Sequence, residues 1–297
     1  MSDFITLLPM LLIGTMIPIM FGLGLSLSVD DFRRLVGHPK AVVLALALQA
    51  LVLPALCYGL VLLLDVPPVL AIGLMLLAAS PGGFSATLFS HLFGGNVAMN
   101  ISLTAINTLM SIVTLPLIAN FAIARFSEGG QVVPMQTGKV LEIIVIVLVP
   151  VAIGMAVKRV APAFAARTDK PMKIFSMAVL AALALFAFVK EWDALTGSFA
   201  AIGLAVVLFN VASLGLGYCL PRMVGLDRPI AVAISYEIGI HNATLAIFVA
   251  VSVLGDFQLM VPAAIYSVSM YLLATAFGLL VLRRRGSGAA VAAASGQ

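Results

Sequence analysis

The chain has 297 residues, of which 63% are hydrophobic and only 9% are charged. A water-soluble domain of this size carries far more polar residues, so this balance excludes a soluble globular protein and predicts an all-α polytopic membrane protein. The formal net charge of +4 does not indicate nucleic-acid binding, because the basic residues lie in short loops instead of on one face. We therefore expect the lipid bilayer as a partner and no nucleic acid.

Apolar runs long enough to cross a bilayer recur along the chain. About 20 helical residues span the hydrocarbon core. Nine runs reach that length, at 5–27, 41–64, 67–93, 97–122, 139–158, 172–190, 198–220, 228–253 and 259–282. The first run lacks a basic leader and a small-residue cleavage site, so it is predicted to be a span and not a secretory signal. The sequence thus predicts nine transmembrane helices and, from its small residues, a disordered tail over 286–297.

The loop charges predict the orientation of these spans. When loops are assigned alternately to two sides, thirteen basic residues fall on one side and three on the other. The smaller set is Arg125, Lys139 and Lys190, and the larger set is Arg33, Arg34, Lys40, Lys158, Arg159, Arg167, Lys170, Lys173, Arg222, Arg228, Arg283, Arg284 and Arg285. The positive-inside rule then places the N-terminus outside the cell and the C-terminus with its tail in the cytoplasm.

Two predicted spans are interrupted at their centres. The third contains Ser80-Pro81-Gly82-Gly83, and the eighth contains Tyr236, Glu237, Gly239, His241 and Asn242. Main-chain groups freed by a break cannot be satisfied by lipid, so they must be buried in protein or line a cavity. Because the two spans run in opposite directions, the paired breaks predict an inverted repeat in which spans one to four match six to nine. The alternative is that each proline or glycine is a simple kink.

Glu237 is the most informative residue, because it is a carboxylate within the apolar run from Pro229 to Leu254. A charge at bilayer depth costs at least ~2.5 kcal/mol, so it should face a cavity, an ion or a partner. The fourth span adds a polar stripe on one helix face, made of Asn100, Thr104, Asn107 and Ser111. Hydrogen bonding between helices is the alternative explanation of that stripe. Other spans contribute Gln49, Ser85, Thr87 and Asn210.

These groups predict cation binding next to an anion site. Carboxylate, amide, hydroxyl and freed main-chain oxygens are ligands of hard cations, and a single carboxylate suits a monovalent ion. The half-helix N-termini near Phe84 and Asn242 carry partial positive charge, which suits an anionic substrate group. Cation-coupled uptake of an organic anion follows as a hypothesis.

Several motifs resemble those of the bile acid:sodium symporter family, from about residue 21 to 282. They are His38-Pro39-Lys40, Gln49 five residues before Pro54, Ser80-Pro81-Gly82-Gly83 followed by Gly95-Asn96-Val97-Ala98, and Tyr236-Glu237-Ile238-Gly239-Ile240-His241-Asn242. The resemblance implies one transporter unit over 1–285 with two crossed discontinuous helices. Its core domain covers about 41–122 and 198–282, and its panel domain about 5–27 and 139–190. A nine-helix bacterial member would take up a small organic anion, a carboxylate or a bile-acid-like molecule, with sodium across the inner (plasma) membrane by alternating access.

The family's ion ligands, carried over by position, imply two sodium sites that share Glu237. The first consists of Glu237, Thr87, Asn100 and Thr104, with Ala86 where a serine commonly stands. The second consists of Glu237, Gln49, the main-chain carbonyls of Ile238 and Ile240, and His241 in place of a glutamine. The implied substrate-binding residues are Phe84, Ser85, His241 and Asn242. No cofactor is expected, and sodium serves as the coupling ion.

His241 and the function as a whole each leave alternatives open. The histidine could be a neutral hydrogen-bonding group, a substrate contact, or a titrating group that replaces one sodium by a proton, since an unperturbed histidine titrates near ~6.5. A proton-coupled transporter or a sodium/proton exchanger using Glu237 and His241 is the main alternative to symport. A more remote one is an intramembrane serine hydrolase with Ser85 and His241. We expect no enzyme, because that alternative leaves Glu237 unexplained.

Overall fold

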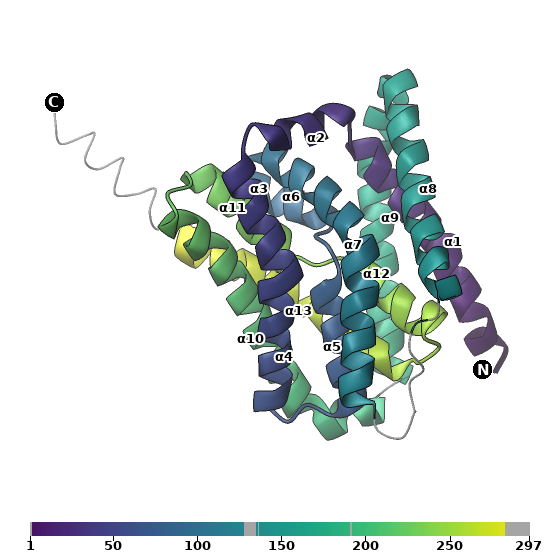
Figure 1. Cartoon of the computed structure of the whole chain (residues 1–297). Coiled ribbons are helices and arrows are strands. Elements are labelled where there is room, and N and C mark those ends of the chain that lie inside the picture. The colour runs from purple at the N-terminus through teal and green to yellow at the C-terminus, as the bar shows by residue number, and fades with distance from the viewer. Residues whose placement is uncertain (1, 128–134, 136, 191, 283–297) are drawn as a thin grey trace.

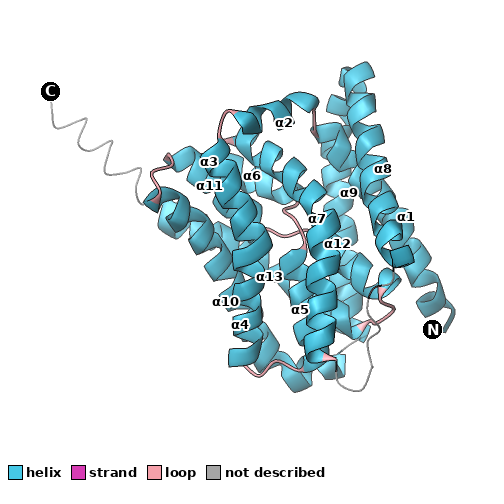
Figure 2. Ribbon diagram, viewed as in Figure 1, coloured by secondary structure: helices cyan, strands magenta, loops and turns pink. Residues whose placement is uncertain are grey.

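The computed structural model describes residues 2–127, 135, 137–190 and 192–282. Within these ranges the chain is helical apart from short loops, and its β pairing is one isolated bridge (Figure 2). Five helices in the described part are long and apolar enough to cross a membrane, or up to six if one bent pair counts as a single span. The prediction of an all-α polytopic membrane protein is confirmed.

The first half of the chain contains two long uninterrupted helices, α1 and α7, and several shorter or composite ones. They are α1 (Ser2–Ser26), α2 (Val29–Val36), α3 (Pro39–Ala47), the π-helical η1 (Leu48–Val52), α4 (Leu53–Leu63), α5 (Pro68–Ala79), α6 (Phe84–Leu92) and α7 (Val97–Phe126). Segments α3, η1 and α4 follow one another without a gap, so they form one long helix with a π turn at its centre.

The second half repeats this mixture of long and interrupted helices. It comprises α8 (Thr137–Val160), α9 (Pro162–Lys190), α10 (Trp192–Met223), α11 (Arg228–Gly239), α12 (Ala243–Phe248), η3 (Val249–Val253), η4 (Gln258–Met260), α13 (Val261–Phe277) and η5 (Gly278–Leu282). Arginines 283 to 285 and the predicted tail, 286–297, lie outside the described residues.

Both predicted helix breaks are present. Ser80 ends α5 in an extended conformation, with φ −73° and ψ 142°, which is the conformation that a following proline favours. The second break separates α11 from α12, and the Asn242 side chain caps α12 by accepting the backbone N–H of Leu245 at 3.1 Å. The breaks therefore have local causes that can be read in the sequence.

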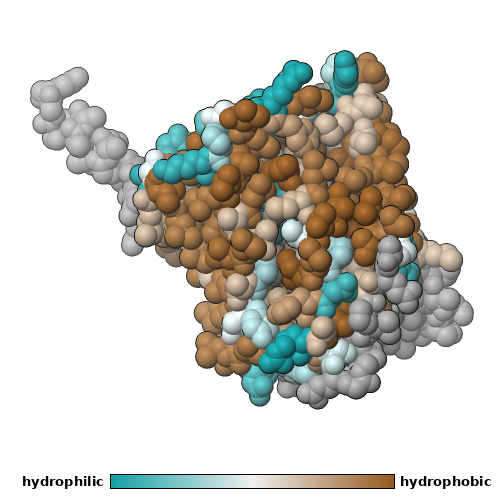
Figure 3. Space-filling model, viewed as in Figure 1, coloured by the Kyte–Doolittle hydropathy of each residue, from teal (hydrophilic) through white to brown (hydrophobic). Residues whose placement is uncertain are grey.

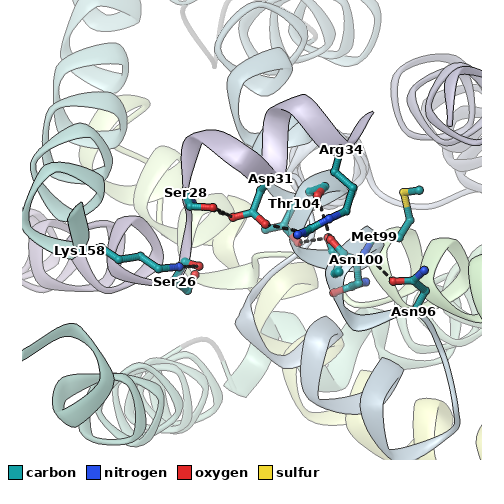
Figure 4. A network of polar contacts seen from close by, with 11 residues as sticks. Ser26, Ser28, Asp31, Arg34, Asn96, Met99, Asn100, Thr104 and Lys158 are labelled. Atoms are coloured by element: carbon teal, nitrogen blue, oxygen red, sulfur yellow. Dashed lines mark hydrogen bonds and ion pairs between the residues drawn. The ribbon is translucent and has the colours of Figure 1, made fainter. Parts of the chain in front are cut away.

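The short helix α2 is a correction to the sequence analysis, which treats that stretch as a loop. Its N-terminus is held by a capping box, in which the backbone N–H and the hydroxyl of Ser28 both donate to Asp31 at 2.7 Å. Arg34 pairs with the other oxygen of Asp31 at 2.9 Å (Figure 4). The axis of α2 turns 60° from that of α1. A helix of eight residues with this many charges falls below any hydropathy criterion for a span.

Helices α1 and α8 pack along one another at one side of the molecule (Figure 1). Two glycines permit this approach: a Cβ at Gly24 would lie 2.9 Å from the carbonyl carbon of Val151, and one at Gly154 would lie 2.8 Å from the Cα of Gly24. Small residues at such contacts are typical of helix packing in membranes. At the other side, α10 contacts α11 and α13.

The surface differs from that of a soluble protein. Hydrophobic residues cover most of the visible face, and hydrophilic residues gather towards its two ends (Figure 3). The interior is mostly hydrophobic as well, but it also holds buried polar residues, among them Glu237, Asn100, Asn107 and Asn210. An apolar surface fits a protein that is surrounded by lipid, and polar groups buried at that depth call for partners inside the protein.

Candidate ion and substrate site

The two helix breaks meet in the middle of the molecule and hydrogen-bond to each other (Figure 2). The N–H of Gly83 donates to the carbonyl of Ile240 at 3.2 Å, and the N–H of Asn242 donates to the carbonyl of Pro81 at 2.8 Å. Gly82 and His241 form an isolated antiparallel bridge between them. Each break thus satisfies main-chain groups of the other, as irregular backbone at this depth requires.

Gly82 is required where the first break faces Glu237. A Cβ at this position would lie 2.5 Å from the carboxyl carbon of Glu237, far inside van der Waals contact. The Pro-Gly-Gly motif therefore both breaks the helix and makes room for the acidic side chain.

Glu237 is fully buried and accepts side-chain hydrogen bonds from α7. The hydroxyl of Thr104 donates to Oε2 at 2.6 Å, and the amide of Asn107 donates to Oε1 at 3.1 Å. Among the described residues, no lysine or arginine lies within ion-pair distance of the carboxylate. A buried carboxylate that is compensated only by hydrogen-bond donors has a strong attraction for a cation.

Asn100 links three elements around this carboxylate. Its Oδ1 accepts the hydroxyl of Thr87 at 2.7 Å, and its Nδ2 donates to the carbonyl of Ala233 at 2.9 Å. The Thr104 hydroxyl also lies 3.0 Å from the carbonyl of Asn100, but its single proton favours the shorter, charged contact with Glu237. The four residues of the first predicted sodium site thus lie close together as two bonded pairs, Thr87 with Asn100 and Thr104 with Glu237, and the buried Ala86 beside Thr87 in the chain supplies no side-chain oxygen.

The two side chains that complete the second predicted site, those of Gln49 and His241, both bond to the carbonyl of Ser80. Gln49, on the π turn η1, donates to this carbonyl at 2.9 Å and to that of Ala78 at 3.2 Å. Nδ1 of His241 lies 2.9 Å from the same oxygen and must carry a proton, because a carbonyl only accepts. The imidazole stacks on Phe209 and meets Tyr266 edge-on, with ring centroids 5.5 and 5.4 Å apart. On this side of the crossing two nitrogen donors thus point at Ser80, while Oε1 of Gln49 and Nε2 of His241 are buried and have no partner among the described residues.

The main-chain carbonyls at the end of α11 have different partners. That of Ile240 accepts from Gly83, and that of Gly239 accepts from Asn210 at 2.9 Å and from Tyr266 at 2.8 Å. The N–H of Asn242, the usual helical donor to Ile238, bonds to Pro81 instead. Of the two carbonyls in the predicted ligand set, that of Ile238 is thus released from its helical donor, while that of Ile240 serves the pairing of the breaks.

A cavity of about 70 Å³ lies beside the crossing. Residues of both breaks line it together with residues of α1, α9 and α13, and Ser85, His241 and Asn242 are among them. The hydroxyls of Ser85 and Tyr271 are 2.9 Å apart on its wall. Because Oδ1 of Asn242 caps α12, only Nδ2 of this side chain is left to contact a ligand. Phe84 begins α6, but its side chain lies outside the described part of the structure.

Ser85 and His241 do not form the hydrogen bond that a serine hydrolase needs between nucleophile and base. Ser85 bonds to Tyr271, and His241 bonds to Ser80. Within the described residues there is also no group of three or more His, Cys, Asp or Glu side chains that could hold a metal ion. The arrangement provides neutral oxygens around one carboxylate, which is suited to a monovalent cation.

Sequence reasoning missed three aromatic partners and one direct contact. Tyr271, Phe209 and Tyr266 lie in apolar spans, where nothing in their spacing sets them apart from core residues. Asn107 is in the predicted stripe but not in the predicted ligand set, although it contacts Glu237. Its position three residues after Thr104, on the same helix face, is the signal that could have identified it.

Comparison with known proteins places this geometry in a family context. The chain is 30% identical over 251 residues to the uncharacterized sodium-dependent transporter YocS of Bacillus subtilis, covering 84% of this chain and 76% of YocS. It is 27% identical over 249 residues to the probable sodium/metabolite cotransporter BASS1 of Arabidopsis thaliana, covering 84% of this chain and 61% of BASS1. To the human P3 protein it is 28% identical over 224 residues, covering 75% of this chain and 47% of that protein.

The chain therefore spans about three fifths of the length of the plant cotransporter and less than half of the human protein. A sequence profile of the Sodium Bile acid symporter family matches residues 13–198. This match covers more than half of the chain and includes the first break, η1 and α7. The chain belongs to the Sodium Bile acid symporter family.

Proposed function

We propose that the protein is a secondary active transporter that couples the uptake of a small organic anion to sodium by alternating access. One observation carries the proposal: Glu237 is fully buried, accepts bonds from Thr104 and Asn107, and has no cationic partner among the described residues. A charge in this position requires a mobile cation. The names of YocS and BASS1, a sodium-dependent transporter and a sodium/metabolite cotransporter, support sodium as that cation.

The proposed sodium ligands are those expected from the sequence. Glu237, Thr104, Asn100 and Thr87 form the first site, and their closeness supports it, since the Thr104 hydroxyl donates to Glu237 and lies 3.0 Å from the carbonyl of Asn100, which bonds to Thr87. Gln49, the carbonyls of Ile238 and Ile240, and His241 form the second. Here the bond from Nδ1 of His241 to Ser80 supports the neutral, hydrogen-bonding role of the histidine. We expect sodium to fit the first site better, because its ligand set is made of carboxylate, hydroxyl and amide groups that supply oxygens, whereas Gln49 and His241 of the second present nitrogens to Ser80.

The proposed substrate is a carboxylate or a similar small anion, bound by Ser85, Asn242, His241 and Phe84 in the cavity beside the crossing. The lining residues include no lysine or arginine. A bare carboxylate would therefore enter a site that lies near the negative charge of Glu237 and offers only neutral donors. Sodium bound at Glu237 removes that repulsion, which gives a physical reason why anion and cation would bind together.

The proposal includes nine spans, an inverted repeat with crossed discontinuous helices, and core and panel domains with the ranges given above. The cavity supports this division, because it lies where the paired breaks and α13 approach α1 and α9. Lys40 bonds to the carbonyl of Val224, and Lys158 to that of Ser26 at 2.6 Å. These contacts fit the grouping of basic loops at one face, which we propose is the cytoplasmic face of a bacterial inner membrane.

Thermal unfolding of the purified protein tests sodium binding without a known substrate, because a ligand that binds only the native state raises its stability. We expect sodium chloride, but not potassium chloride, to raise the melting temperature of the wild-type protein. A panel of organic anions is then added with sodium, and those that raise the melting temperature further are identified as substrates. Absence of a sodium effect would contradict the proposal. Proton movement driven by sodium in vesicles without any anion would indicate the exchanger instead.

A further inference from the structure

Asn107 contacts Glu237 directly, yet the ligand set carried over from the family gives it no role. Its side-chain amide donates to Oε1 of Glu237 at 3.1 Å. Its own Oδ1 is buried and has no hydrogen-bond partner. A buried amide oxygen without a partner costs free energy, so its place beside a carboxylate calls for a ligand that can use it.

The chemistry that this oxygen would complete is cation binding. Ala86 supplies no side-chain oxygen where the family commonly has a serine, so the first site lacks one ligand. Asn107 lies on the same face of α7 as Thr104, and both reach Glu237. An amide oxygen is a normal ligand of a hard cation. The Asn107 oxygen is thus available beside Glu237, in a site that lacks one oxygen.

The amide can serve in two ways without any movement of the helix. Rotation about the Cβ–Cγ bond of asparagine is soft, and half a turn exchanges the amide nitrogen for the oxygen. With the nitrogen towards Glu237, the N–H stabilises the carboxylate of an empty site. With the oxygen in that place, a cation at Glu237 gains a ligand. A symporter needs both states, because after releasing its cargo it must change conformation without an ion while the charge of Glu237 is still buried.

We propose that Asn107 is a sodium ligand in this chain and that its amide turns between donor and ligand as the ion leaves and binds. This inference rests on the proposed sodium coupling at Glu237. It assigns the missing oxygen of the first site to α7. It predicts that the Asn107 amide donates a hydrogen bond to Glu237 in the empty protein and supplies an oxygen ligand to sodium in the loaded protein.

Three variants of the full-length protein separate these contributions. Asn107→Leu removes both donor and oxygen, and Asn107→Asp keeps an oxygen but loses the N–H. Thr108→Val is the matched control, because the equally buried Thr108 donates only to the carbonyl of Thr104, at 2.7 Å. Melting temperature is measured against sodium chloride, with choline chloride holding the ionic strength constant.

We expect Asn107→Leu to raise the apparent dissociation constant for sodium roughly tenfold, and Thr108→Val to leave it unchanged. Asn107→Asp should bind sodium at least as tightly as the wild type. It should also melt at a lower temperature in choline chloride, because the empty site then holds two acidic groups and no amide donor. Its sodium-induced increase should therefore exceed that of the wild type.

Two results would overturn the inference. One is an Asn107→Leu protein whose sodium affinity stays within about twofold of the wild-type value. The other is an Asn107→Asp protein that binds sodium less tightly than the wild type. If Asn107→Leu does not fold, the sodium affinity of Asn107→Asp is the deciding measurement.

If the wild type and Thr108→Val both fail to respond to sodium, the proposed function fails and the inference fails with it. If all variants respond as the wild type does, the inference alone is wrong.

Discussion

Glu237 and His241 lie four residues apart at the same helix crossing, yet their surroundings differ. Towards α7, Glu237 accepts bonds from one hydroxyl, that of Thr104, and from one amide, that of Asn107. Towards η1 and α10, His241 and Gln49 both donate to the carbonyl of Ser80, and aromatic rings flank the histidine. Each side also holds a buried amide oxygen that has no partner among the described residues, Oδ1 of Asn107 and Oε1 of Gln49. Because the side chains that bond to the carboxylate both come from α7, we propose that the stronger ion position lies on that side.

The largest expected effect comes from removing the charge on the α7 side. Glu237→Gln keeps the shape of the side chain but not the negative charge that binds the ion. We expect the dissociation constant for sodium to rise at least roughly 100-fold, which is about 2.7 kcal/mol. Sodium-dependent melting and sodium-dependent uptake should be lost together. Wild-type sodium dependence in this variant would show that the ion binds elsewhere.

Crowding the carboxylate should have the next largest effect. In Gly82→Ala, the new methyl group would lie 2.5 Å from the carboxyl carbon of Glu237, so the side chain or the break must shift. Overpacking of this kind costs about 1–3 kcal/mol of stability, and we expect sodium affinity to fall with it. Gly59→Ala is the control, since a Cβ there meets nothing within 4 Å. Equal effects in both variants would mean that contact with Glu237 is not the cause.

Removing one hydroxyl on the α7 side tests the network itself. Thr104→Val keeps the volume but loses the 2.6 Å bond to Glu237. A hydrogen bond to a charged group is worth about 1.5–3 kcal/mol, so we expect sodium affinity, measured by thermal titration, to fall roughly tenfold or more. Thr104→Ser should restore most of it. A serine variant as weak as the valine variant would indicate a role in packing and not in bonding.

A change on the His241 side of the crossing should have a smaller effect on sodium affinity, and it should alter the steepness of the sodium dependence. His241→Gln removes a stacked ring and supplies an amide oxygen beside Ser80. We expect this variant to show steeper sodium dependence of uptake than the wild type, because an oxygen ligand replaces a nitrogen at the second ion position. The sodium concentration for half-maximal uptake should change by only a few-fold. If the steepness stays the same, the idea that the His241 nitrogen weakens the second position is wrong.

The smallest effect is expected away from both ion positions. Ser85→Ala removes the 2.9 Å bond to Tyr271 on the cavity wall. A neutral hydrogen bond is worth about 0.5–1.5 kcal/mol, so the KM for the anion should rise a few-fold, and Tyr271→Phe should match it. Sodium-induced stabilisation without substrate should not change in either variant. A loss of sodium affinity as large as in Thr104→Val would contradict the separation of ion and substrate sites.

Much of the fold could be predicted because its causes are local. Apolar runs of spanning length mark the helices, Pro81 with its two glycines ends α5, and the polar cluster from Glu237 to Asn242 marks the second break. The short α2 escaped prediction, because a charged helix of eight residues gives no hydropathy signal. The π turn at Gln49 escaped as well, since the run over 41–64 is apolar on nearly every side and a rotation of the helix face leaves no mark in it.

The sequence by itself determined which groups are costly in lipid. A lone carboxylate, a polar stripe on one helix face and two broken spans were all readable, because burial penalties and helix breaking depend on residue type and near neighbours. Only the tertiary structure decided which of these groups meet. The bond between Asn107 and Glu237 joins residues 130 positions apart, and His241 meets Ser80 across 161 positions. Such pairings depend on how helices rotate and pack around the crossing, which no local pattern specifies.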